Sequence, residues 1–200
     1  MPRDSDRTRA NILAAAVSEF AARGYAGARV DRIASRAGAN KRMIYHHFGG
    51  KKAIFQAALA EQLTMGSTTE NLVRLWMHEA LERGDADIVS LPERRKLAAE
   101  RIEATCRAQQ RGELPACLDP ALLTMARLAL DAFPLAFPQL VHVYLGNRAT
   151  SRDFRKAWTG FIADWHGSAP RRRTKPRLRL DRDGIAQAAT RPREPRRPDP

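Results

Sequence analysis

The chain has 200 residues, of which 44% are hydrophobic, and a formal net charge of +13 at pH 7. This length suits one or two domains with a sizeable core, and no apolar run approaches the roughly 20 residues that would span a bilayer. The charged N-terminus is unlike a secretion signal, and two cysteines are too few for a disulfide framework or a zinc-ligand pattern.

Positive charge is concentrated at the two ends of the chain. Residues 1–62 hold 11 Lys and Arg against 5 Asp and Glu, and residues 166–200 hold 11 against 4. Residues 63–165 hold 13 of each and are therefore neutral. Basic segments bind the phosphate backbone of nucleic acids through the release of counterions. The distribution predicts a nucleic-acid contact at the ends of the chain and an ordinary globular middle.

Apolar residues recur with helical spacing throughout the first 166 residues. The first predicted helix, over residues 6–23, ends at Gly24, a residue suited to positive φ. Two short helices are predicted over 30–37 and 41–47, and a longer helix begins near Lys51. Further helices are predicted over 69–83, 92–111, 119–133, 136–146 and 152–166. No segment alternates with period two, so the sequence predicts an all-α protein.

Residues 29–48 have the pattern of a helix-turn-helix. A short apolar helix ends before Gly38, and the next helix places Ile44 and Phe48 opposite its basic and polar residues. Two short helices joined by a Gly-containing turn place the second helix in the DNA major groove. The candidate DNA-binding residues lie on this helix and at the start of the next one: Asn40, Lys41, Arg42, Met43, Tyr45, His46 and Lys51.

These side chains have chemically suitable partners on DNA. Asn40 is a good N-cap for the second helix. Arg42 can pair bidentately with guanine, and Met43 can touch a thymine methyl group. Tyr45 can donate its hydroxyl to a phosphate, and Lys51 can bind a phosphate together with the free amides of the helix that it begins. The alternative interpretation is a solvated basic helix face.

Residues 7–63 resemble the N-terminal DNA-binding domain of the TetR family of bacterial transcriptional regulators. The similarity includes Gly24-Tyr25, Ile33-Ala34, Ala37-Gly38, the run from Tyr45 to Phe48, and Lys51. Two features differ from the family pattern. Arg29 replaces a Ser or Thr that caps the first helix of the motif, so that cap must come from the backbone, water or Asp31. Arg42 and Met43 replace small residues near the start of the recognition helix.

The resemblance implies a bacterial cytoplasmic homodimer that binds a palindromic operator in double-stranded DNA and is nucleoid-associated when bound. The predicted domains are a helix-turn-helix domain over 6–66, a helical ligand-binding and dimerisation domain over 67–166, and a basic tail over 167–200. The tail holds few large apolar residues, so it is predicted to be disordered. The dimer surface is expected from Leu122, Leu123, Ala126, Leu130, Phe154, Trp158, Phe161, Ile162 and Trp165.

The favoured function is a repressor that a small apolar or aromatic ligand releases from its operator. Control by a protein partner, constitutive regulation, and non-specific binding through the basic tail are alternatives. An enzyme has little support, since the sequence has no Gly-rich phosphate loop, HExxH or GxSxG motif; no catalytic residue, metal ligand or cofactor is expected. Large residues of the middle domain suit either a ligand pocket or plain core: Trp76, Met77, Met125, Phe133, Phe137, Leu140 and Tyr144.

Overall fold

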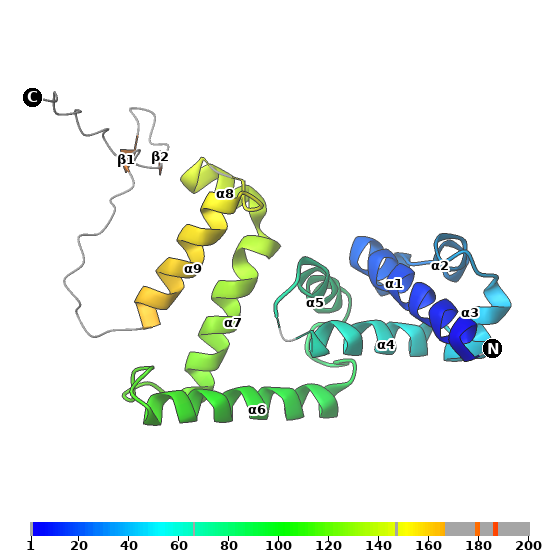
Figure 1. Ribbon diagram of the computed structural model, residues 1–200, viewed down its shortest axis with the longest axis horizontal. Coiled ribbons are helices and arrows are strands. Elements are labelled where there is room, and N and C mark those ends of the chain that lie inside the picture. Colours follow the sequence, from blue (N-terminus) through cyan, green and yellow to red (C-terminus); the bar gives the residue numbers. More distant parts are fainter. Residues whose placement is uncertain (1, 66, 147, 167–178, 181–185, 188–200) are drawn as a thin grey trace, which may run out of the picture. The chain divides into compact units, whose positions relative to one another are not determined.

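The computed structural model describes residues 2–65, 67–146, 148–166, 179–180 and 186–187 (Figure 1). Over these residues the backbone forms nine α-helices and one pair of two-residue strands, and the prediction of an all-α fold is confirmed. The strands Arg179–Leu180 (β1) and Ala186–Gln187 (β2) pair antiparallel. They fall in the segment predicted to be disordered, and the rest of that segment lies outside the described residues.

The helices belong to two compact units, which divide after Ala136. The second unit holds α8 (Pro138–Leu145) and α9 (Arg152–His166). No single helix of the described residues is long and apolar enough to cross a membrane, although α8 and the helix before it, Pro120–Ala136, would pass that test if counted together. The first unit holds α1 (Pro2–Gly27), α2 (Val30–Arg36), α3 (Lys41–Phe48), α4 (Lys51–Thr64), α5 (Glu70–Arg83), α6 (Leu91–Gln110) and α7 (Pro120–Ala136).

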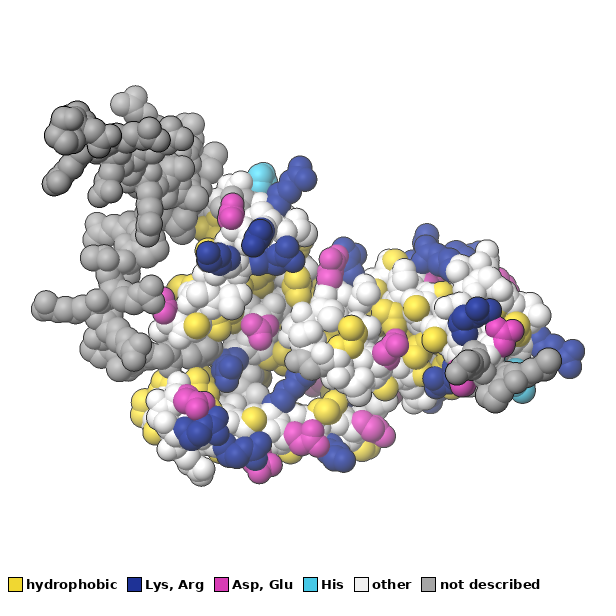
Figure 2. All heavy atoms as spheres, in the orientation of Figure 1, with side chains coloured by type: hydrophobic (Ala, Val, Ile, Leu, Met, Phe, Trp, Pro, Cys, Tyr) yellow, Lys and Arg dark blue, Asp and Glu magenta, His cyan; other side chains and the backbone are white. Residues whose placement is uncertain are grey.

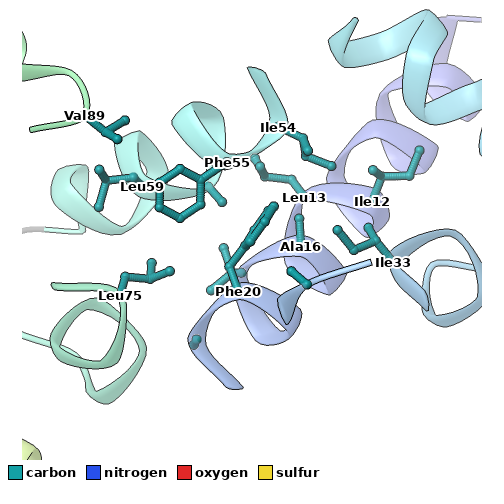
Figure 3. Close-up of a cluster of buried hydrophobic side chains, with 14 of the residues drawn as sticks. Ile12, Leu13, Ala16, Phe20, Ile33, Ile54, Phe55, Leu59, Leu75 and Val89 are labelled. Atoms are coloured by element: carbon teal, nitrogen blue, oxygen red, sulfur yellow. The ribbon is translucent and has the colours of Figure 1, made fainter. Parts of the chain in front are cut away.

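One hydrophobic core joins α1 to α5. The ring of Phe20 on α1 meets the ring of Phe55 on α4 edge to face, with 4.9 Å between the centroids (Figure 3). Ile33 from α2 and Ile44 from α3 are fully buried in the same cluster, which also includes Leu75 from α5. Burying one such side chain contributes about 1.5–3 kcal/mol. The helix-turn-helix is therefore held by the same core as the first helix of the predicted ligand domain.

Polar contacts connect the helices of this core to α6 and α7. The buried carboxylate of Glu79 on α5 accepts a hydrogen bond from the Val89 amide at 2.9 Å and forms an ion pair with Arg94 on α6. The hydroxyls of Thr105 on α6 and Thr124 on α7 lie 2.7 Å apart. These contacts satisfy polar groups that burial would otherwise leave without partners. They connect α5, α6 and α7 in sequence.

Large apolar side chains are exposed on the later helices. Leu122 and Met125 on α7 are 63% and 62% exposed, and Phe161 on α9 is 51% exposed. Two residues expected on the dimer surface are instead buried in the chain itself. Leu123 is 4% exposed because one side of α7 packs against α5 and α6. Phe154 is 5% exposed, and its ring stacks on that of Trp158 one turn later.

A sharp corner at Gly24 interrupts α1 shortly before its end at Gly27. Gly24 has φ 66° and ψ −179°, a conformation almost restricted to glycine. Glu82 of α5 lies against this corner, and its Oε2 accepts a hydrogen bond from the Ala26 amide at 3.3 Å. The carbonyl of Ala26 accepts a hydrogen bond at 3.3 Å from Nζ of Lys51, the first residue of α4. The backbone of Ala26 therefore connects α5 with the start of α4.

Replacing Gly24 with Ala should destabilise the protein by about 2 kcal/mol, because the backbone is strained and the new Cβ would lie 2.1 Å from Oε1 of Glu82. Chemical denaturation measures the change. Gly27→Ala is the matched control, since its Cβ would meet only Cβ of Arg23 at an ordinary 3.5 Å. Equal losses in the two variants would contradict the importance of the corner.

Candidate nucleic-acid interface

The helix α3 presents one polar side to solvent. It begins after Asn40, whose Oδ1 accepts a hydrogen bond from the Met43 amide at 3.0 Å, which confirms the predicted N-cap. It ends at Gly49, which adopts the left-handed conformation with φ 81°. Ile44 points into the core and is fully buried, whereas Arg42 and His46 are exposed. The capped ends and the buried isoleucine fix which side chains of α3 face outward.

Three other residues predicted to contact DNA are already engaged in contacts within the chain. Met43 is half-buried and packs against the core. Tyr45 is 49% exposed, and its ring lies beside Gly50. Lys51 is half-buried, with Nζ 4.8 Å from the centre of the Tyr25 ring and hydrogen-bonded to the corner at the end of α1. A DNA contact by these three residues stays a prediction, and for Lys51 it would compete with existing interactions.

An arginine from α1 also lies at the end of α3. The guanidinium of Arg9 stacks over the ring of Phe48, 5.0 Å from its centre, and Arg9 is exposed. A cation over an aromatic face is attracted by the ring quadrupole. Basic side chains lie over α2 and α3 in Figure 2, with acidic side chains among them. The surface around α3 is therefore basic but not uniformly so.

Sequence reasoning missed the residue that joins α1 to α2. The side chain of Glu19 is fully buried, and its Oε1 accepts hydrogen bonds from the Arg29 amide at 3.2 Å and from Nε of Arg32 at 2.7 Å. Arg36 places its guanidinium 3.6 Å from Oε2. The side chain of Arg29 makes no capping hydrogen bond for α2. Glu19 on α1 therefore supplies the acceptor for the amide of Arg29, the residue that precedes α2.

The charge of Glu19 is stabilised by its neighbours. Burial alone would raise the pKa of Glu19, but hydrogen bonds from Arg32 and the Arg29 amide and the charges of Arg32 and Arg36 outweigh burial and lower it. Its Oε2 makes no hydrogen bond within the described residues. One clue was present in the sequence, since Glu19 stands seven residues after Ile12, within the apolar stripe of the first helix.

The predicted pocket residues lie in both units of the chain. Trp76 on α5 is half-buried, and its buried Nε1 has no hydrogen-bond acceptor among the described residues. Met125 and Tyr144 are 62% and 71% exposed, so most of each side chain meets solvent. The pocket as a whole stays a prediction. The remaining members are half-buried or partly exposed: Met77, Phe133, Phe137 and Leu140.

The sequence of this chain is similar to those of known transcriptional regulators. A family model for bacterial regulatory proteins of the tetR family matches residues 12–58. The HTH-type transcriptional repressor SCO4008 of Streptomyces coelicolor is 30% identical over 173 residues, which cover 76% of this chain and 90% of that protein. The HTH-type transcriptional repressor NicS of Pseudomonas putida is 41% identical over 71 residues, or 36% of this chain and 34% of that protein.

Solved structures share the fold over most of the chain. A candidate transcriptional regulator of Streptomyces coelicolor, SCO4942, superimposes with a TM-score of 0.65 at 22% identity and covers 81% of this chain and 99% of its own. A candidate TetR-family regulator from Rhodococcus has a TM-score of 0.57 at 21% identity, with 82% and 100% covered. At these identities the likeness concerns the fold.

Glu19→Gln should lower the free energy of unfolding at pH 7 by about 2 kcal/mol, because a neutral amide replaces a buried carboxylate bonded to arginine. The folded-state pKa of Glu19 is lowered, so its contribution is complete above the unfolded pKa of 4.5 and is lost as pH falls through the folded value. Denaturation of the wild type and the variant from pH 7 to 3 should show the two stabilities converging in acid.

The control for this change is Glu113→Gln, which removes the charge of an exposed glutamate that pairs with Arg111. An exposed ion pair contributes little, so this variant should match the wild type at pH 7. A constant difference between the Glu19 variant and the wild type at every pH would contradict the role of the charge.

Proposed function

The chain belongs to the TetR family of bacterial regulatory proteins, and from this premise we propose that it is a dimeric repressor that reads a palindromic operator through α3. The observation that carries the proposal is the asymmetry of α3. Its inner side is fixed by the fully buried Ile44, and its outer side exposes Arg42 and His46. Side chains held this way on a short helix reach base edges in the major groove.

Dimerisation places two copies of α3 on one duplex. The exposed apolar residues Leu122 and Met125 support an association surface on α7, and the exposed Phe161 supports one on α9. A two-fold symmetric dimer presents the same surface from both subunits. Its two recognition helices then enter successive major grooves on one face of the DNA. We infer that residues 6–66 bind DNA and that the later helices make the dimer in the bacterial cytoplasm.

Release by a small ligand is supported by Trp76 on α5. Its buried indole N–H has no acceptor within the part of the chain that the structure describes, and a ligand with a carbonyl, carboxylate or hydroxyl oxygen would satisfy it. The same helix carries Glu82, which holds the corner at the end of α1. A ligand that favours a shifted position of α5 would therefore disturb α1 and α4, and would lower DNA affinity by the same coupling free energy.

Selection of operators from random duplexes by the purified protein should recover an inverted repeat. The two half-sites should be centred about 34–36 Å apart, or a multiple of that spacing, because each subunit contributes one recognition helix. Binding to the selected site should be at least about 10³-fold tighter than to arbitrary DNA at physiological salt. Recovery of no consensus, or of a single asymmetric site, would contradict a dimeric sequence reader.

Arg42→Ala should relax base preference at one position in each half-site and reduce operator affinity by about 1–3 kcal/mol. The physical reason is the loss of a bidentate guanidinium–guanine contact. Affinities for operators mutated one base pair at a time measure the effect. The control is Arg95→Ala, which removes an exposed arginine from α6 and should leave the preference unchanged. Uniform weakening on every sequence would show that Arg42 contacts phosphate instead.

A further inference from the structure

An ion pair joins the two helices of the helix-turn-helix at their N-terminal ends. Nζ of Lys41 lies 3.0 Å from Oδ1 of Asp31, and the two side chains are 54% and 71% exposed. Asp31 stands in the first turn of α2, and Lys41 is the first residue of α3. The pair therefore lies on the surface, at the end of the helix that we place in the major groove.

The surroundings of this pair are basic. Arg29 immediately precedes α2, Arg42 follows Lys41, and both are exposed. The hydrogen bond that Lys41 donates to Asp31, and then the negative charge of Asp31, raise the pKa of Lys41 and keep the ammonium paired. A carboxylate in this position cancels much of the charge that Lys41 would offer to a phosphate, and it repels the phosphate directly. Asp31 thus opposes DNA binding by its basic neighbours.

We propose that Asp31 limits the affinity of the protein for DNA by holding Lys41 in an ion pair that phosphate must displace. The proposal rests on the proposed approach of α3 to DNA. Exposed ion pairs are weak and are screened by salt, so phosphate competes with Asp31 and binding is reduced rather than prevented. Weaker binding to arbitrary sequences limits the retention of the regulator on the many competing sites of a genome.

Asp31 also has a structural role that the experiment must separate. A carboxylate in the first turn of a helix interacts favourably with the free amides of that turn. The substitution Asp31→Asn removes the charge and keeps the size and a polar oxygen. Thermal unfolding of the variant should therefore change little. The second measurement on the same variant is its affinity for DNA. This affinity should increase because the carboxylate beside Lys41 is lost.

The test measures binding of the full chain to an arbitrary duplex of about 30 base pairs across a range of salt concentrations. Asp31→Asn should bind about threefold to tenfold more tightly at low salt, and its affinity should fall more steeply with salt, by about one counterion per protomer. Glu113→Gln is the control, because it removes the same charge from another exposed ion pair, outside the helix-turn-helix. Its affinity should equal that of the wild type.

The same Asp31→Asn substitution, made in the Lys41→Gln variant, tests whether the gain in DNA affinity depends on Lys41. In Lys41→Gln, the gain from Asp31→Asn should be smaller, since no ammonium remains to be released and only the direct repulsion between Asp31 and phosphate is removed. An equal gain in the Glu113 control, an undiminished gain without Lys41, or weaker binding by Asp31→Asn would each overturn the proposal. The base preference of Arg42→Ala is measured in a separate experiment, which tests the proposed function independently of Asp31. If it still relaxes while Asp31→Asn has no effect, the proposed function stands and the role of Asp31 is rejected.

Discussion

A buried carboxylate at the junction of α1 and α2 constrains the helix-turn-helix of this structure. Glu19 accepts hydrogen bonds from the Arg29 amide and from Arg32, and the guanidinium of Arg36 lies nearby. These contacts hold α2 against α1, and α3 follows after a short turn with Ile44 anchored in the shared core. The direction in which α3 points therefore depends on a charge that is fully buried between α1 and α2.

The basic residues of the first unit divide into two groups by what they touch. Arg32 and Arg36 turn inward to Glu19, and Lys51 is held over Tyr25 at the corner of α1. Arg42 remains exposed on α3. Net charge by itself consequently overstates the charge available to phosphate. The orientation of individual guanidinium and ammonium groups decides how much of it can act on DNA.

Much of this fold follows from local sequence features, whereas its charged junctions do not. Helical periodicity, the Asn40 cap and the positive φ of Gly24 depend on neighbouring residues and could be predicted. The role of Glu19 could not, because its partners are supplied by a different helix after a sharp corner. The prediction that Leu123 lies on a dimer surface was wrong because hydrophobic periodicity shows that one side of a helix is apolar. It does not show which other helix covers that side.

Methylation interference on the selected operator tests the central claim, that α3 reads the major groove. Methyl groups on guanine N7 project into the major groove, and those on adenine N3 project into the minor groove. The proposed function predicts that N7 methylation blocks binding in two symmetric clusters one helical turn, or a multiple of it, apart. Interference confined to adenine N3, or the absence of interference at every guanine, would contradict it.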